Sequence, residues 1–237
     1  MAAIVARLLP VIVVCLCLPA FFGGAAEKDT DVAAEYIAKE LMAIEGLFPA
    51  SSQVVLVAQT EAPGPDARLW AFTMEDGTWK PVLGPVPATV GRNGFAPSGQ
   101  KREGDGRTPP GIYSLGFAFG YGPKIDSAMP YRQMTLSDIW VDDPASPDYN
   151  RPKKRGETRA KSFEDMVLKD DRYKYGIVIR YNTDPVVPGA GSAIFLHVWK
   201  DAATPTSGCV AVSEENILKL LKWLDPGKRP IIMLEKP

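Results

Sequence analysis

The chain contains a single histidine, His197, which lies twelve positions before a cysteine, Cys209. A thiolate is a strong nucleophile, but a free cysteine has a pKa of about 8.5 and needs a nearby base or cation to ionise. Imidazole is the usual partner. The two residues together predict a catalytic pair in which Cys209 is the nucleophile and His197 its base. Taken singly, each has a simpler interpretation, a buried small apolar thiol and a satisfied polar group on a strand.

The first 26 residues have the pattern of a secretory signal peptide. Arg7 is the only charged side chain before Glu27, an apolar run follows it, and small residues end the segment. The run is short for a membrane-spanning helix and is broken by Pro19, which favours cleavage over a retained anchor. We therefore expect residues 1–26 to be removed, the protein to be exported to the periplasm or cell envelope, and no stable membrane span to remain.

Loss of that segment changes the cysteine count. Cys15 and Cys17 leave with it, so the mature chain keeps only Cys209 and cannot form an intramolecular disulfide. An unpaired thiol in an oxidising compartment calls for an explanation. A reactive role for Cys209 is one such explanation.

The residues before the cysteine, Thr206-Ser207-Gly208, predict a tight turn. Glycine lets the backbone turn sharply and lets a substrate carbonyl approach closely. The backbone N–H groups of Gly208 and Cys209 could then face a developing oxyanion. The hydroxyls of Thr206 and Ser207 could hold the turn or touch substrate. Since no third triad side chain is evident, a backbone carbonyl could orient His197.

Other chemistries find little support in the sequence. The formal net charge is −1, from 27 basic and 28 acidic residues, so there is no excess of basic charge to bind nucleic acid. One histidine and one mature cysteine make a zinc site only if carboxylates complete it. The glycine-rich loops lack the Gly-Lys-Ser/Thr ending of a phosphate loop. We expect neither a metal nor a cofactor.

The last third of the chain predicts the sheet that would position the pair. Its apolar segments rich in β-forming residues are 175–182, 192–199, 208–213 and 229–235. His197 falls near the end of one expected strand and Cys209 at the start of the next. Neighbouring strands lie about 4.8 Å apart, so the two side chains can come into contact. Ser213 is the expected N-cap of a helix that docks on this sheet.

The whole chain predicts a mainly β fold, of the α+β type with a few helices. Strands are expected at 53–59 and 68–75, and the 22 prolines and 21 glycines favour turns over a helical bundle. A short lead-in helix is expected within 27–52, before a domain over 53–237.

Residues 121–174 show little periodicity. A long irregular segment in a compact domain is often a lid or a binding loop. Its aromatic side chains, led by Trp140 and Tyr131, could then pack on substrate. Composition alone fits an insertion without function nearly as well.

These residues resemble the L,D-transpeptidases with a YkuD-type catalytic domain. That family carries a histidine on one strand and then S/T-x-G-C, matched here by His197 and by Thr206 to Cys209. It often shows T-P-x-G before a strand, matched by Thr108-Pro109-Pro110-Gly111. The resemblance covers roughly 53–237 and implies a β-sandwich or mixed-sheet catalytic domain.

Two positions depart from the family pattern and indicate a divergent branch. Many members have arginine two positions after the cysteine, where this chain has Ala211, and glycine after the histidine, where it has Val198. A peptidoglycan stem ends in a carboxylate, and arginine is its best bidentate partner. Arg102 and Arg107, in the charged loop 101–107, are the candidates to replace the missing charge. A simple solvated turn fits that loop equally well.

The resemblance implies peptidoglycan stem peptides as the partner. The family opens the bond between the diamino acid at stem position three and the terminal D-alanine, forms a thioester on the cysteine, and transfers the acyl group to an amine of another stem. The residues alone indicate only an exported thiol acyl-transfer enzyme.

Two alternatives remain open. One is a wall peptidase or amidase that uses the same pair with water as acceptor. Papain-like and NlpC-like thiol peptidases place the cysteine before the histidine, the reverse of this chain. The other is a non-catalytic wall-binding module. The sequence makes no prediction of oligomeric state.

Overall fold

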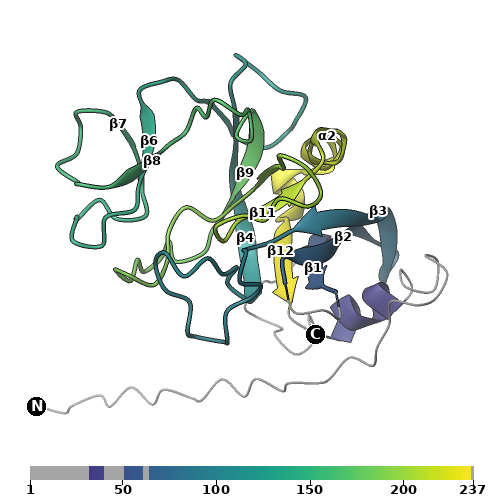
Figure 1. Ribbon diagram of the computed structural model, residues 1–237. Helices are drawn as coiled ribbons and strands as arrows, with labels where there is room; N and C mark the ends of the chain where they lie inside the picture. Colours follow the sequence, from purple (N-terminus) through teal and green to yellow (C-terminus); the bar gives the residue numbers. More distant parts are fainter. Residues whose placement is uncertain (1–31, 40–50, 61–63, 236–237) are drawn as a thin grey trace, which may run out of the picture.

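The computed structural model describes residues 32–39, 51–60 and 64–235, which fold around a nine-stranded mixed sheet (Figure 1). In chain order its strands are β1 (Gln53–Gln59), β2 (Asp66–Glu75), β3 (Thr78–Thr89), β4 (Gly111–Gly120), β5 (Tyr131–Gln133), β9 (Tyr175–Ile179), β10 (Phe195–Val198), β11 (Val210–Val212) and β12 (Ile231–Glu235). Across the sheet the order is β12-β1-β2-β3-β11-β10-β9-β4-β5. Because β12 also pairs with β4, the sheet closes on itself. The prediction of a mainly β, mixed-sheet fold is confirmed.

Strand alternation divides the core between the two faces of this sheet. On β1, Val55 and Val57 belong to one buried cluster, while Val54 and Leu56 belong to another. The first cluster is completed by Ile217, Leu220 and Leu221 of α2 (Glu214–Trp223). The second includes Ala33 and Ile37 from the helical residues 32–39.

The two expected helices have different outcomes. The helix after Ser213 is confirmed as α2, and the Ser213 hydroxyl accepts a hydrogen bond from Asn216 N as an N-cap should. A 3-10 turn, η1 (Pro226–Lys228), follows it and leads into β12. Within 27–52, residues 32–39 are helical, and 27–31 and 40–50 lie outside the described residues. The expected signal segment, 1–26, also lies outside them, and no helix in the described part of the chain is long and apolar enough to cross a membrane.

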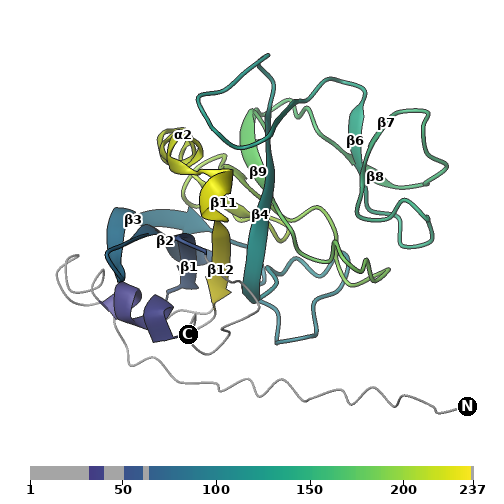
Figure 2. The same cartoon turned by 180° about the vertical axis from the view of Figure 1, so that it is seen from behind.

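Residues 121–174 are more ordered than their sequence predicts. Besides β5, they form β6 (Asp138–Val141), β7 (Pro152–Lys154) and β8 (Phe163–Asp165), which pair antiparallel in the order β7-β6-β8. Strands of three or four residues are too short to show a period of two, so they could not be recognised from the sequence. In Figures 1 and 2 this small sheet lies at the opposite end of the molecule from helical residues 32–39.

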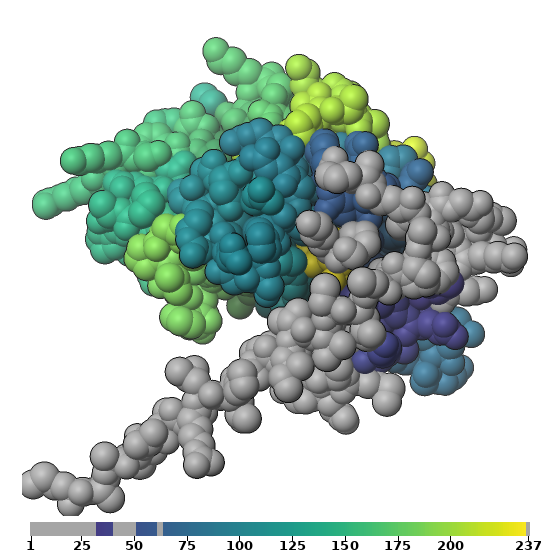
Figure 3. Space-filling view, turned by 60° about the horizontal axis from the view of Figure 1, so that its bottom comes forward, coloured from purple at the N-terminus to yellow at the C-terminus, as the bar shows by residue number. Residues whose placement is uncertain are grey.

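The small sheet packs on the main sheet over the expected nucleophile. Their contact is a buried cluster, called here the Cys209 cluster, made of Phe119, Met134, Trp140, Met166, Tyr173, Val178, Ala193, Phe195 and Cys209. Beside the insertion, the long loop between β3 and β4 covers the middle of one face (Figure 3). The insertion therefore forms one wall around the thiol.

Candidate active site

The structure brings His197 and Cys209 to the same face of two adjacent strands. β10 and β11 are parallel neighbours in which His197 pairs with Ala211, and Cys209 lies two residues before Ala211. Side chains two residues apart on a strand share a face, so the imidazole and the thiol are diagonal neighbours. Tyr173 joins them. Its ring lies edge-on to the imidazole, with centroids 5.0 Å apart, and it packs in the same buried cluster as the sulfur, where it acts to lower the pKa of the thiol.

Cys209 is held as a neutral thiol. Its residue is 7% exposed, its Sγ donates to Ala193 O at 3.2 Å, and it accepts from Phe195 N at 3.4 Å. Burial, and then the charge of Glu164, raise the pKa of the thiol to about 12. A nucleophilic role for this thiol would therefore require its proton to leave during the attack rather than before it.

His197 is held as a neutral imidazole with a defined tautomer. The residue is 3% exposed, and burial lowers its pKa to about 4 despite the hydrogen bond to the Val198 carbonyl. That bond joins Nδ1 to Val198 O at 2.7 Å. A carbonyl can only accept, so Nδ1 carries the hydrogen and Nε2 keeps the lone pair that a base needs. The orienting backbone carbonyl that the sequence left open is thus Val198 O.

The nucleophile turn is fixed by two threonines. Thr206 Oγ1 accepts from Gly208 N at 3.1 Å and donates to Cys209 O at 2.6 Å. Thr108, fully buried, accepts from Gly91 N at 2.9 Å and donates to the same carbonyl at 3.4 Å. The Gly208 N–H is therefore already bonded within the turn, contrary to the expectation that it faces an oxyanion.

Gly208 is required here for its conformation. Its φ of +148° is one that L side chains rarely adopt, and a Cβ would lie 2.9 Å from Arg107 O. The Arg107 backbone thus presses against the nucleophile turn. Gly208 lets the β3–β4 loop approach Cys209 this closely.

Asn150, which sequence reasoning did not identify, ties the insertion to the acceptor of the thiol hydrogen. Its Oδ1 accepts from Trp140 Nε1 at 2.9 Å and from Ala193 N at 3.1 Å. Ala193 has a φ of +52°, unfavourable for a residue with a Cβ. Such strain persists only where the surroundings enforce it. The Asn150 amide is one of the groups that hold Ala193 O on the sulfur.

The two aromatic residues expected to face substrate lie elsewhere. Trp140 is 3% exposed and packs edge-on against Phe195, with ring centroids 5.0 Å apart, inside the Cys209 cluster. Tyr131 pairs with Ala118 on the opposite face of β4 from Phe119, and its hydroxyl donates to Gly122 O. Trp140 therefore supports the site from behind, and Tyr131 lies on the other face of the sheet.

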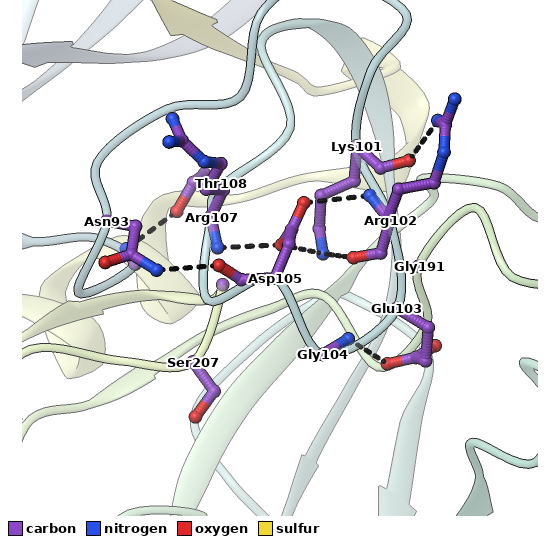
Figure 4. Close-up of polar contacts among 12 residues, drawn as sticks. Asn93, Lys101, Arg102, Glu103, Gly104, Asp105, Arg107, Thr108, Gly191 and Ser207 are labelled. Atoms are coloured by element: carbon purple, nitrogen blue, oxygen red, sulfur yellow. Dashed lines mark hydrogen bonds and ion pairs between the residues drawn. The ribbon is translucent and has the colours of Figure 1, made fainter.

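The charged loop contacts the nucleophile turn through its backbone, whereas its two candidate arginine side chains point away. Arg102 Nη1 donates to Gly99 O and Lys101 O, and Arg107 Nη1 donates to Phe95 O. Figure 4 shows both guanidinium groups directed away from Ser207. Asp105 folds the loop by accepting from Lys101 Nζ at 2.7 Å and from the backbone N–H groups of both arginines. Their proposed role in reading a carboxylate stays a prediction.

A different arginine lies beside the nucleophile turn. Arg92 N donates to Thr206 O at 2.9 Å, and Arg92 Nη1 donates to the exposed Ser207 hydroxyl at 3.3 Å. Its guanidinium lies so close to Gly106 that a Cβ there would meet Arg92 Cζ at 2.7 Å. The one feature of the sequence that points to Arg92 is its position in the glycine-rich start of the loop.

No metal site accompanies this arrangement among the residues that the structure describes, where no three histidine, cysteine or acidic side chains gather closely enough to bind an ion. Two further polar side chains act on the thiol, those of Tyr173 and Glu164. Tyr173 Oη donates to Glu164 Oε1 at 2.6 Å.

Comparison with known proteins agrees with this geometry. The family model for the YkuD L,D-transpeptidase catalytic domain matches residues 61–233, which include both His197 and Cys209. Neither a comparison with curated proteins nor one with solved structures gave a match. The matched segment is most of the chain and runs from five residues before β2 into β12. The chain therefore belongs to the L,D-transpeptidase family with a YkuD catalytic domain, a family of enzymes that act on peptidoglycan.

Proposed function

We propose that this chain is an exported cysteine acyltransferase that remodels or cross-links peptidoglycan by L,D-transpeptidation. The observation that carries the proposal is the placement of the lone His197, on β10, and the lone mature Cys209, just before β11, on one face of the sheet, with Tyr173 packed against the imidazole and in the same cluster as the thiol. Nothing in a merely structural thiol requires an oriented neutral imidazole beside it. The signal-like pattern of residues 1–26 supports export, since the polymer lies outside the cytoplasmic membrane.

Acylation begins from the neutral pair. The thiol hydrogen leaves Ala193 O and passes to His197 Nε2 as Sγ attacks the carbonyl carbon of the third stem residue. With the Gly208 N–H committed to Thr206, the Cys209 N–H is the donor left in the turn for the oxyanion. His197 returns its proton to the departing D-alanine nitrogen, which leaves a thioester on Cys209.

Deacylation repeats these steps with a new nucleophile. The acceptor amine attacks the thioester carbonyl, gives a proton to His197, and the C–S bond breaks as the proton returns to sulfur. Because His197 has a low pKa, about 4, it releases its proton readily at each stage. Water in place of the amine would make the same site a carboxypeptidase, which is the second candidate.

Product analysis separates these functions. Purified wall fragments with tetrapeptide stems are incubated with the enzyme, and the products are identified by mass spectrometry. We expect release of D-alanine together with stem dimers joined at residue three. Release of D-alanine with only tripeptide monomers would establish the hydrolase instead. Binding to the fragments without any product would leave only the wall-binding module.

Arg92 is expected to read the stem carboxylate, because it contacts Ser207 in the nucleophile turn. Arg92→Gln removes the charge but keeps a polar side chain. We expect it to raise the KM for stems ending in a free carboxylate by about tenfold, as hydrogen bonds to charged groups contribute about 1.5–3 kcal/mol. Steady-state kinetics on free and amidated stems measure the difference.

The matched control is Arg102→Gln, in the same loop with its guanidinium on backbone carbonyls away from Ser207. Arg102→Gln should leave both KM values near those of the unmodified enzyme. A larger effect from Arg102→Gln or Arg107→Gln would favour the arginines expected from the sequence. An equal effect on free and amidated stems would show that Arg92 does not read the carboxylate.

A further inference from the structure

Tyr173 packs against the imidazole of His197 and shares a buried cluster with Cys209, and a carboxyl group lies behind it. The residue is buried, its ring lies 78° to the plane of the His197 imidazole, and its hydroxyl acts to lower the pKa of the Cys209 thiol. The same hydroxyl donates to Glu164 Oε1 at 2.6 Å. Glu164 lies on β8, opposite Trp140 of β6, so the small sheet delivers a carboxyl group to the nucleophile through one tyrosine.

We propose that Glu164 is a positioning residue whose carboxyl group decides, through the hydroxyl of Tyr173, whether the sulfur of Cys209 receives a hydrogen bond. This inference rests on the proposed role of Cys209 as nucleophile. It assigns the insertion a function that neither the family motif nor the direct contacts of the pair contain.

The switch follows from the single hydrogen of a tyrosine hydroxyl. An ionised Glu164 can only accept, and it holds that hydrogen in the bond observed at 2.6 Å. A protonated Glu164 can donate its own O–H to the Tyr173 oxygen, which frees the tyrosine hydrogen for the sulfur. The exchange moves one proton between solvent and the Glu164 carboxyl, and no other covalent bond changes.

The surroundings of Glu164 set the pKa of its carboxyl group so that both states are populated near neutral pH. Burial raises its pKa, the Tyr173 hydrogen bond lowers it, and the result is a pKa of about 7. The charges that act on it, in order of effect, are those of Asp142, Arg172 and Glu103. Because Glu164 also raises the pKa of the thiol through its charge, ionised Glu164 opposes thiolate formation in two ways.

The other charge that acts on the sulfur is already engaged. Lys101 lowers the pKa of Cys209, but its Nζ donates to Asp105 Oδ1 at 2.7 Å and to Arg102 O at 2.7 Å. The Lys101 side chain is thus held by its own loop. Glu164 is the acidic side chain in contact with Tyr173 whose charge changes there.

The test is the alkylation rate of Cys209 by a small haloacetamide, measured from pH 6 to pH 9 on the full chain. Glu164→Gln removes the charge, and its amide can donate to the Tyr173 oxygen. We expect alkylation at pH 8 to become about threefold to tenfold faster, since a lower pKa gives more thiolate of somewhat lower nucleophilicity. In the unmodified protein, log rate should rise by less than one unit per pH unit around pH 7. Glu164→Gln should restore a slope of one.

Asp165→Asn is the matched control. It removes the same charge from the next residue of β8, where the side chain is 51% exposed and pairs with Arg155. We expect neither its rate nor its slope to differ from those of the unmodified protein. A Glu164→Gln variant that behaves like Asp165→Asn would overturn the proposal.

A second comparison tests whether Glu164 acts through the tyrosine. Tyr173→Phe keeps the ring contacts with His197 and Phe195 but removes the hydroxyl. The acceleration by Glu164→Gln should fall by more than half in that background. An undiminished acceleration would mean that the carboxylate acts by its electric field alone, and the positioning role would be wrong.

The outcome is separable from that of the proposed function, because alkylation needs no wall substrate. If Glu164→Gln leaves the alkylation rate of Cys209 unchanged and the enzyme still makes stem dimers, this inference alone is wrong. If Glu164→Gln changes the alkylation rate as expected but the protein neither joins nor hydrolyses stems, the proposed function alone is wrong.

Discussion

Cys209→Ser is expected to lower the release of D-alanine from tetrapeptide stems by on the order of 10⁴-fold. Serine replaces sulfur with a far less acidic hydroxyl. The imidazole of His197, with a pKa of about 4, is too weak a base to take a proton from it. The same low basicity is adequate for a thiol only because sulfur parts with its proton more easily.

The fold should tolerate this exchange. A serine hydroxyl can donate to Ala193 O as the thiol does, and the Phe195 N–H has an acceptor in either case. We expect the free energy of unfolding to change by no more than about 1–2 kcal/mol. Near-normal turnover in Cys209→Ser would remove Cys209 as the nucleophile, whereas loss of turnover with loss of folding would make the result uninformative. Cys209→Ala is the second variant for that case, because it brings no new polar group into the cluster, although it removes the sulfur that accepts from Phe195 N.

The strands around the pair could be predicted because local pattern and burial agree there. Residues 192–199 are apolar apart from Ser192 and His197, and β10 is fully buried within them. Ser213 and the acidic residues after it marked the start of α2 for the same reason, since capping is decided by neighbours in sequence. The pair itself could be found because each member occurs once in residues 27–237.

The surroundings of the pair could not be predicted, because they depend on contacts between distant segments. Glu164 reaches the sulfur only by way of Tyr173, and the three-residue β8 that carries Glu164 has no recognisable period. Ala193 adopts a positive φ that its type disfavours, so propensity argues against the conformation that the Asn150 side chain enforces. Burial, which sets the ionisation of both members of the pair, likewise depends on the insertion.

The same limit applies to the directions of the aromatic and basic side chains. The sequence placed Trp140 in a segment of little periodicity, but the face it presents depends on the register of β6 with β8. Arg102 and Arg107 were chosen by nearness in sequence to a glycine-rich loop. Their side-chain directions follow from Asp105, which folds the loop around its carboxylate.

His197→Ala is expected to lower acyl transfer by about 10³-fold, since a positioned general base contributes about 10²–10⁴. The structure places no second base beside the sulfur in the described residues: Tyr173 has a pKa raised well above its usual value, and Glu164 is separated from the sulfur by Tyr173. His197→Ala should also open a cavity against the Tyr173 ring, so His197→Gln is the variant to compare, as it fills more of that space.

The decisive measurement is the double variant His197→Gln/Cys209→Ser. If the imidazole acts only by moving the thiol proton, its removal costs nothing more once sulfur is gone, and the double variant should be as active as Cys209→Ser alone. Independent roles would instead multiply the two losses. Multiplied losses in D-alanine release, with folding intact in all three proteins, would mean that His197 and Cys209 do not work as a unit. In that case the neutral pair described here would be an architectural feature of β10 and β11 rather than the origin of the chemistry.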